Sequence, residues 1–309
     1  MSDSMTALQL SFSQYIKEYN GGLFLNEPLS EHCSFKIGGE AEILFVPHDE
    51  KALAAALEYA EIHSAPLHIL GNGSNVLISD EGLSGIVLQL MNGLCDIIYL
   101  GDSVIGCAAG VSLKRLCSFA LEHSLSGLEF AYGIPGSVGG AVYMNAGAYG
   151  GEIKDVLMSV RSISRNGAQL CEEKAEELDL SYRNTPFMKN GRIITAAYFR
   201  LTPDNPENIR AKMNGLMEKR RSSQPLQYPS AGSVFKRPET GYAAAFIDQC
   251  GLKGLSVGSA QVSEKHAGFI VNRGGATFKD VSELMKKIQN EVLARHGVRL
   301  EPEIEILKD

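Results

Sequence analysis

The sequence predicts an α+β protein with more than one domain. Its 309 residues are enough for two or three domains with substantial cores, and 44% of them are hydrophobic while 21% are charged. Short apolar runs bounded by Gly, Asn and Asp alternate with longer segments of helical periodicity. The Pro- and Asn-bearing segment 202–208 separates a mainly strand-forming region from a basic helical region, so we expect a domain boundary there.

The region before this boundary is predicted to hold two helices among several strands. Apolar residues at helical spacing, from Leu53 to Ala60, predict a helix over 49–64 that Pro66 closes. Ser112 is suited to cap a second helix that runs to about residue 124. Strands are predicted at 67–70, 76–79, 85–90, 97–100, 104–109, 160–165 and 193–201.

The region after the boundary is predicted to combine helices, a loop and strands. A long helix is expected to start at the capping-box pattern Thr277…Asp280 and to end at Gly297. The other elements expected here are helices at 207–221 and 242–250, a Pro- and Ser-rich loop at 222–240, and strands at 268–272 and 298–307.

The charge of the chain argues against one class of protein and indicates a basic region. The net charge of −7 argues against a general nucleic-acid binder. Residues 203–276 nevertheless carry ten Lys and Arg against six Asp and Glu, which indicates either a site for a small anion or a solvated basic face.

The chain is expected to be cytoplasmic. No segment has the length of a membrane span, and the first ten residues lack the pattern of a secretion signal, so we expect no membrane association. The six cysteines form no CxxC pair, which favours free buried thiols and predicts no metal site.

Two glycine-rich segments carry the strongest functional signal. The second glycine loop (residues 132–151) also holds apolar residues, so it is packed rather than a flexible linker. Glycines that allow the backbone to approach closely, with exposed N–H groups, suit the oxygens of a diphosphate, although a tightly packed turn and helix is the alternative. The first glycine loop (residues 70–79) departs from the dinucleotide fingerprint, since Val76 stands where Gly is needed and a strand follows in place of a helix. It is either a strand–loop–strand turn whose backbone amides and Ser and Asn side chains face a phosphate, or an ordinary hairpin.

These loops and further blocks resemble one family along nearly the whole chain. The blocks, in order, are FKIGGEA (35–41), LGNGSNVLI (70–78), 128–153, LSYRNTPF (180–187), QPLQYPSAGSVFKRP (224–238), 246–272 and LEPEIEI (300–306). Their order resembles that in the UDP-N-acetylenolpyruvoylglucosamine reductases, also called UDP-N-acetylmuramate dehydrogenases. The shorter form of this family is indicated, because no tyrosine-bearing insertion follows the SYR block.

The resemblance implies an FAD-binding region of the vanillyl-alcohol-oxidase type, followed by an α+β substrate domain. The implied FAD-binding domain covers 18–202, with subdomains at about 18–81 and 82–202. The substrate domain then covers 203–296, and residues 297–309 form a C-terminal strand that returns to the flavin site.

The resemblance also implies an enzyme of peptidoglycan precursor synthesis. NADPH would reduce FAD, and the reduced flavin would pass its hydride to the enolpyruvyl group of UDP-N-acetylglucosamine enolpyruvate, which gives UDP-N-acetylmuramate. We expect a monomer.

Three residues match the family's catalytic positions. Arg183 suits bidentate contact with the substrate carboxylate, and Glu303 lies beside that group, where it would be protonated or share a proton. Ser233 matches the proton donor, with Lys236 as a candidate to stabilise the alkoxide that it leaves.

Further residues are expected to bind the cofactor and the substrate. The cofactor candidates are Gly71, Asn72, Gly73, Ser74, Asn75, Gly133, Ile134, Pro135, Gly136, Ser137, Gly139, Gly140, Asn145, Ala146 and Gly147. The substrate candidates are Tyr182, Arg220, Arg221, Lys236, Lys253 and His266. Ser223 stands where many relatives carry a basic residue, so Arg220 or Arg221 would have to make that phosphate contact.

Two other functions remain open on the sequence alone. A flavin oxidase of the same fold would be reduced by an alcohol or sugar and poorly by NADPH. A flavin-free nucleotide-sugar binding protein would be colourless when purified.

Overall fold

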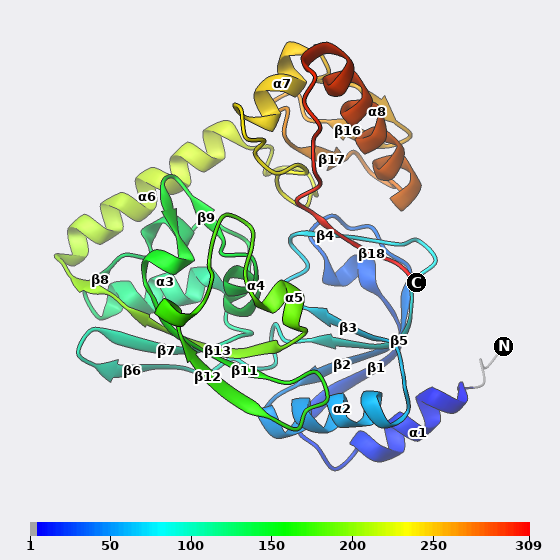
Figure 1. Cartoon of the computed structure of the whole chain (residues 1–309), viewed down its shortest axis with the longest axis vertical. Helices are drawn as coiled ribbons and strands as arrows, with labels where there is room; N and C mark the ends of the chain where they lie inside the picture. The colour runs from blue at the N-terminus through cyan, green and yellow to red at the C-terminus, as the bar shows by residue number, and fades with distance from the viewer. Residues whose placement is uncertain (1–4) are drawn as a thin grey trace. The chain divides into compact units, whose positions relative to one another are not determined.

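The computed structural model describes residues 5–309, which fold into two compact units (Figure 1). Unit 1 contains residues 5–27, Glu42–Asn72 and Ser84–Glu218, and unit 2 contains Pro28–Ala41, Gly73–Leu83 and Lys219–Asp309. Helices and strands are mixed in both units, so the predicted α+β class is confirmed. The domain ranges inferred from the family resemblance remain a prediction.

A four-stranded sheet with two helices forms one part of unit 1. The strand order is β1 (Gly21–Pro28), β2 (Glu40–Pro47), β5 (Leu83–Gln89) and β3 (Leu67–Leu70). Helices α1 (Ala7–Ile16) and α2 (Glu50–Ile62) lie side by side along it (Figure 1). Phe12 of α1 joins the layers, because its ring lies 5.8 Å from the Phe45 ring in β2 and 5.1 Å from the Tyr59 ring in α2. The sequence predicted α2 but not α1, β1 or β2.

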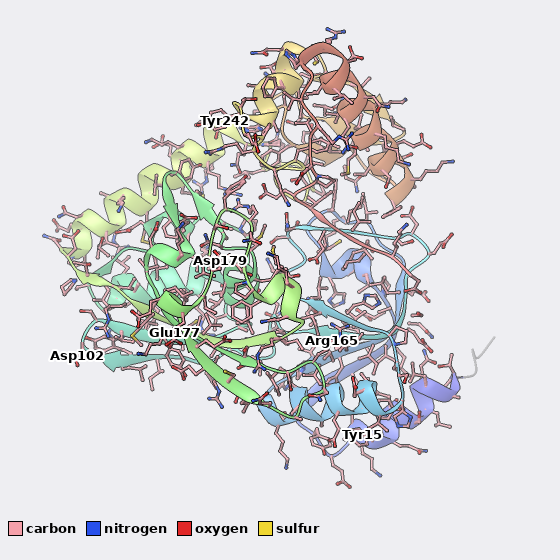
Figure 2. All side chains as sticks on the ribbon, in the orientation of Figure 1. Tyr15, Asp102, Arg165, Glu177, Asp179 and Tyr242 are labelled. Atoms are coloured by element: carbon pink, nitrogen blue, oxygen red, sulfur yellow. The ribbon has the colours of Figure 1, made fainter. Side chains whose placement is uncertain are left out.

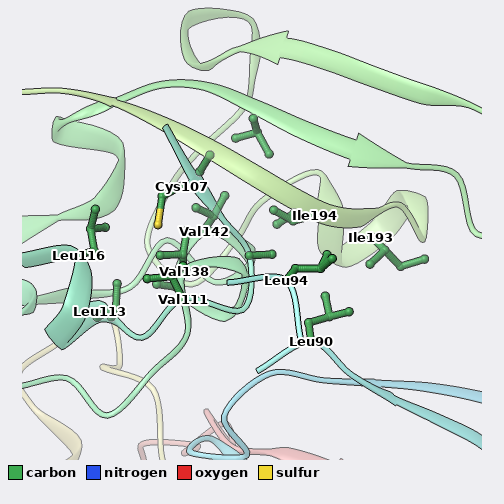
Figure 3. Close-up of a cluster of buried hydrophobic side chains, with 14 of the residues drawn as sticks. Leu90, Leu94, Cys107, Val111, Leu113, Leu116, Val138, Val142, Ile193 and Ile194 are labelled. Atoms are coloured by element: carbon green, nitrogen blue, oxygen red, sulfur yellow. The ribbon is translucent and has the colours of Figure 1, made fainter. Parts of the chain in front are cut away.

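A five-stranded antiparallel sheet forms the other part of unit 1. Its order is β12 (Leu170–Lys174), β11 (Leu157–Ile163), β13 (Ile193–Arg200), β7 (Val104–Ala108) and β6 (Ile97–Gly101). Helices α3 (Leu113–Glu122) and α4 (Val138–Tyr143) complete its core, where Cys107, Leu116 and Val142 are buried (Figure 3). Ser112 caps α3 as predicted, since its hydroxyl accepts a hydrogen bond from the Arg115 N–H.

A buried carboxylate of unit 1 holds the basic helix α6 (Pro206–Ser223), whose residues up to Glu218 belong to that unit. Glu129 is 3% exposed and accepts hydrogen bonds from the Ser126 hydroxyl and the Gly127 N–H, and its Oε2 lies 3.2 Å from Lys212 Nζ in α6. Burial alone would raise the pKa of Glu129, but these hydrogen bonds and the lysine charge outweigh it and lower that pKa.

Unit 2 is built on a small antiparallel sheet of β15 (Ser256–Val257), β16 (Ala260–Val262) and β17 (Ile270–Asn272). Helix α8 (Phe278–His296) packs against β15 and β16, and α7 (Ala243–Gln249) packs against α8 (Figure 1). The predicted boundaries of α8 are confirmed, because Thr277 and Asp280 form a capping box and Gly297 adopts a φ of +68° at the C-terminus.

The C-terminal strand is shorter than predicted. Only β18 (Glu305–Leu307) forms a ladder, in parallel with β4 (Val76–Ile78), rather than all of 298–307. Pro302 has no N–H to offer a ladder, and the chain around it forms only an isolated bridge to Phe235. The remaining short elements are β8 (Leu125–Ser126), β9 (Gly147–Ala148), β10 (Gly151–Glu152), β14 (Thr202–Pro203), α5 (Phe187–Asn190) and the 3₁₀ turns Leu29–His32, Glu129–Ala131, Ile153–Asp155 and Ala175–Glu177.

The predicted free thiols are confirmed, because none of the six cysteines forms a disulfide. Burial raises the pKa of the Cys107 and Cys117 thiols well above their usual range. Within residues 5–309, no helix combines the length and the apolar character needed to cross a membrane.

Candidate functional site

The two glycine loops meet within unit 1. Asn72 Nδ2 donates a hydrogen bond of 2.8 Å to the Pro135 carbonyl oxygen. A Cβ added at Gly71 would lie 2.6 Å from Ser137 Oγ, which is too close for any residue but glycine unless Ser137 moves. Ser137 is the N-cap of α4, where its hydroxyl accepts a hydrogen bond from the Gly140 N–H at 3.3 Å. The contact thus joins two glycine-containing loops, and loops of this kind can bring backbone N–H groups close to a diphosphate.

Several glycines of the second loop serve close packing. The Gly139 N–H donates to the Ala109 carbonyl oxygen at 2.8 Å, and a Cβ at Gly139 would lie 2.8 Å from the Ala109 Cβ. The Gly136 N–H donates to Ile134 at 2.9 Å. These two N–H groups are therefore bonded inside the chain, and the packing role that the sequence left open is real for Gly139.

The end of the second loop is a two-residue hairpin that the sequence did not predict. Strands β9 and β10 pair through Gly147 and Glu152, while Tyr149 and Gly150 at the tip have φ values of +56° and +88°. Left-handed angles at both tip residues are typical of a type I′ turn. Tyrosine is rare at such a position, so the Tyr-Gly pair gave no turn signal.

Arg183 lies in a strained turn of unit 1. Its φ is +50°, and the turn is closed by two backbone hydrogen bonds between Ser181 and Asn184 of 3.0 and 3.2 Å. Arg183 Nη1 donates to the Asn145 carbonyl oxygen at 3.3 Å, and the guanidinium carbon lies 5.0 Å from the centre of the exposed Tyr182 ring. Non-glycine residues held in this backbone region cluster at functional sites.

Asn145 is fully buried beside that turn, and its side-chain amide makes three hydrogen bonds. Its Nδ2 donates to Glu152 Oε2 at 2.7 Å and to the Ser181 carbonyl at 3.2 Å, while its Oδ1 accepts from the Lys154 N–H at 2.9 Å. Neither Glu152 nor Lys154 is predictable as a partner of Asn145 from the sequence, because both resemble ordinary surface charges after a glycine-rich run.

Ser233, Glu303 and Asn75 come together in unit 2. Residues 233–236 are extended between two other segments: Ser233 forms a bridge to Phe269, and the Val234 carbonyl accepts from the Glu303 N–H at 2.7 Å. Asn75 Nδ2 donates to the Glu303 carbonyl at 3.0 Å, directly before the β4–β18 pairing. The serine and the glutamate are both half-buried.

The rest of the first glycine loop also lies in unit 2. Gly73 has a φ of +59°, and a Cβ there would lie 2.2 Å from the His32 carbonyl oxygen. The Gly73 carbonyl accepts from the Ser34 N–H at 3.0 Å, and the half-buried Ser74 follows. The structure thus places Arg183 in unit 1, and the other two catalytic candidates in unit 2.

His266 is held as a neutral imidazole in unit 2. Its Nδ1 accepts a hydrogen bond of 3.1 Å from the Gly268 N–H, and its ring lies edge-on to Phe269 at 4.9 Å. Burial lowers the pKa of His266, and the Lys253 charge lowers it further. The proton of the neutral ring is therefore on Nε2, which leaves that atom as a hydrogen-bond donor.

The basic substrate candidates of unit 2 differ in their surroundings. Lys236 Nζ lies 3.7 Å from Glu301 Oε2, and Lys253 Nζ lies 2.8 Å from Asp248 Oδ2. Arg220 is half-buried and Arg221 is exposed on the last turn of α6.

The structure also shows the surroundings of Ser223 and Arg237 in unit 2. The Ser223 hydroxyl donates a hydrogen bond of 2.7 Å to the Lys219 carbonyl oxygen, so the Ser223 side chain is bonded within α6. Arg237 is not among the residues predicted from the sequence. Its guanidinium carbon lies 4.6 Å from the ring centre of Tyr242, which is exposed and is labelled in Figure 2.

Residues 5–309 contain no group of three or more His, Cys, Asp or Glu that could hold a metal ion.

Comparison with known proteins covers both glycine loops and the C-terminal region. Residues 41–170 match the FAD binding domain family, and residues 224–307 match the C-terminal domain of UDP-N-acetylenolpyruvoylglucosamine reductase. The chain is 46% identical over 287 residues to the UDP-N-acetylenolpyruvoylglucosamine reductase of Caldanaerobacter subterraneus, which covers 93% of this chain and 94% of that protein. It is 44% identical over 283 residues to the enzyme of the same name from Syntrophomonas wolfei, with 92% and 94% covered.

A solved structure extends the similarity to the fold. The crystal structure of UDP-N-acetylenolpyruvylglucosamine reductase from Thermus caldophilus is 36% identical, with a TM-score of 0.79 that covers 94% of this chain and 99% of that one. Together with the matched FAD binding domain, this similarity confirms the FAD-binding fold that the sequence predicted.

Proposed function

Because the chain belongs to the family of UDP-N-acetylenolpyruvoylglucosamine reductases, we propose that it reduces the enolpyruvyl group of UDP-N-acetylglucosamine enolpyruvate to give UDP-N-acetylmuramate. The observation that carries this proposal is an identity of 46% over 93% of the chain. The predicted resemblance is confirmed, and the chain is an FAD-containing oxidoreductase. NADPH as the hydride source, the cytoplasm as the site of action and a monomeric state are parts of the proposal.

The glycine loops fit a flavin dinucleotide. The close approach of Gly71 to Ser137 and the hydrogen bond from Asn72 to Pro135 hold the two loops together, and a side chain at residue 71 would push Ser137 out of this arrangement. Gly71, Asn72, Gly133, Pro135 and Ser137 would line the diphosphate of bound FAD. The cofactor there would supply two-electron hydride transfer from NADPH to the enolpyruvyl double bond.

The proposed role of Arg183 and Glu303 is to bind the substrate carboxylate. Hydride addition to an enol ether is favourable only when electron density can move onto the neighbouring carboxylate, so cationic and hydrogen-bonding groups must face that group. Arg183 is suited to a bidentate contact with it, and its strained backbone fits a functional position. Glu303 would sit beside the carboxylate with a shared proton.

Ser233 would complete the reaction by giving a proton to the second alkene carbon. The resulting alkoxide needs a positive or hydrogen-bonding neighbour, and Lys236 is available only if its ion pair with Glu301 opens. The Nε2–H of neutral His266 would bind a polar group of the substrate. Tyr182, Lys253 and the two arginines of α6 are the remaining candidates for contact with the nucleotide sugar.

The overall reaction can be tested directly in the purified protein. Incubation of flavin-loaded protein with NADPH and UDP-N-acetylglucosamine enolpyruvate should yield a product with two additional hydrogens, measured by mass spectrometry. Flavin that is reduced by an alcohol or a sugar but not by NADPH would instead favour an oxidase. A folded protein that takes up no flavin at all would contradict the proposal.

A further inference from the structure

The backbone at Arg183 needs support from its surroundings. A residue other than glycine with a φ of +50° costs on the order of 1 kcal/mol, so the turn persists only if neighbouring groups hold it. Within the turn, the Asn184 amide donates to the Ser181 hydroxyl at 3.0 Å, and the Thr185 hydroxyl donates to the Tyr143 carbonyl at 2.6 Å. These bonds hold the two ends of the turn but not the arginine side chain.

Asn145 bonds both the turn and the arginine side chain. Its side-chain amide donates to the Ser181 carbonyl at 3.2 Å, and its own carbonyl accepts from Arg183 Nη1 at 3.3 Å. The residue is 0% exposed and has a φ of +44°, a region that asparagine tolerates better than most residues. One buried residue thus contacts the arginine at its head group and the start of its turn.

Glu152 fixes the orientation of the Asn145 amide. An ionised carboxylate can only accept hydrogen bonds, so the nitrogen of the amide must face Glu152 Oε2 at 2.7 Å. The other carboxylate oxygen lies 2.8 Å from Lys154 Nζ, and the Lys154 N–H bonds the amide oxygen of Asn145 at 2.9 Å. Both ends of the amide are therefore held, and it cannot flip without losing bonds.

We infer that Asn145, oriented by Glu152, is a positioning residue that holds Arg183 for contact with the substrate carboxylate. The inference rests on the proposed function, in which Arg183 makes that contact. It gives Asn145 a different role from the flavin contact that the family resemblance implied, because the Asn145 side-chain amide is bonded to Glu152, Ser181 and Lys154.

Asn145→Asp tests this role with little change in shape or backbone preference. The new carboxylate would face the acceptors Glu152 Oε2 and Ser181 O, so the turn should shift. A displacement of about 1 Å at a reacting centre costs on the order of 100-fold in rate. We expect substrate affinity, measured by calorimetry, and the rate of flavin reoxidation by substrate to fall by roughly 10- to 100-fold, whereas flavin content and reduction by NADPH change by less than about 3-fold.

The double variant Asn145→Asp, Glu152→Gln supplies a rescue. The glutamine amide can donate to the new aspartate, so about 5-fold or more of the loss should return, which is the worth of roughly 1 kcal/mol. Asn92→Asp is the matched control, since Asn92 is an exposed residue with a φ of +66°, and it should leave every measurement unchanged.

Several outcomes would overturn the inference. Normal substrate binding by the Asn145→Asp protein would overturn it. Equal slowing of both half-reactions together with loss of flavin would also overturn it, because that result would assign Asn145 to the cofactor. If Asn145→Asp does not fold, Glu152→Ala should still weaken substrate binding selectively, and no selective effect would count against the role. Arg183→Lys, measured in parallel, separates the two proposals: normal substrate binding in that variant would refute the assignment of Arg183 itself, whereas a loss there without one at Asn145 would refute only the positioning role.

Discussion

Replacement of Gly71 by alanine tests the contact between the two glycine loops. The new methyl group would lie 2.6 Å from Ser137 Oγ, closer than a carbon and a hydroxyl oxygen can approach. Ser137 must therefore rotate its hydroxyl away, and the cap on the Gly140 N–H of α4 is lost. Loss of an N-cap costs about 1 kcal/mol, and the residual strain raises the total to about 1–2 kcal/mol.

A separate effect is expected on flavin binding. Because Ser137 is a candidate to contact the diphosphate, rotation of its hydroxyl would remove one hydrogen bond to the cofactor, so we expect FAD affinity to fall by roughly 5- to 30-fold, the equivalent of about 1–2 kcal/mol. Fluorescence titration with FAD measures the affinity, and urea unfolding of the flavin-free protein measures the change in stability.

A double-mutant cycle with Ser137→Ala decides whether the clash is the cause. The Ser137 Cβ would lie 3.8 Å from the new methyl group, which is an ordinary contact. Ser137→Ala alone should cost about 1 kcal/mol for the lost cap, and Gly71→Ala should add almost nothing to it. Costs that instead add, within about 0.5 kcal/mol, would refute the reasoning.

Three further variants test the catalytic and structural assignments. Ser233→Ala should leave flavin reduction by NADPH intact while slowing reoxidation by substrate by roughly 100- to 10,000-fold, and equal slowing of both steps would remove Ser233 from the proton-donor role. Glu303→Gln should impair the same second step selectively, so unchanged turnover would count against its role. Glu129→Gln should lower the free energy of unfolding by about 1–3 kcal/mol at neutral pH. Because hydrogen bonds and Lys212 hold the folded-state pKa of Glu129 below its ordinary 4.5, its ionised form stabilises the fold above that pH, and this contribution is lost as the pH falls through the folded-state pKa. The difference between the two proteins should therefore shrink in acid, and a constant difference would contradict the assignment.

Elements with strong local signals were predicted well. The capping box at Thr277, the terminal Gly297 and the cap at Ser112 each depend on a few neighbouring residues, and the structure confirms all three. The assembly of unit 2 from 28–41, 73–83 and 219–309 depends on contacts far apart in the sequence, which periodicity does not encode. The final strand was predicted too long because the apolar pattern outweighed the missing N–H of Pro302.

In the candidate site, too, short motifs predict individual residues, whereas the contacts between them depend on the fold. Short motifs predict roles for Ser233 and Glu303, but their proximity depends on the hydrogen bond from the Glu303 N–H to the Val234 carbonyl and on the bridge between Phe235 and Pro302. Nearness to Ser233 in the sequence predicts a role for Lys236, and only the structure reveals the ion pair of Lys236 with Glu301. Asn145 was selected as a cofactor residue, while its bonds to Glu152 and Ser181 required the fold.

The central claim is that one bound flavin carries a hydride from NADPH to an enolpyruvyl sugar. Stopped-flow spectroscopy tests it most directly: NADPH alone should bleach the flavin absorbance of the purified protein, and UDP-N-acetylglucosamine enolpyruvate added afterwards without oxygen should restore it. Flavin that stays bleached after the sugar nucleotide is added would contradict the account.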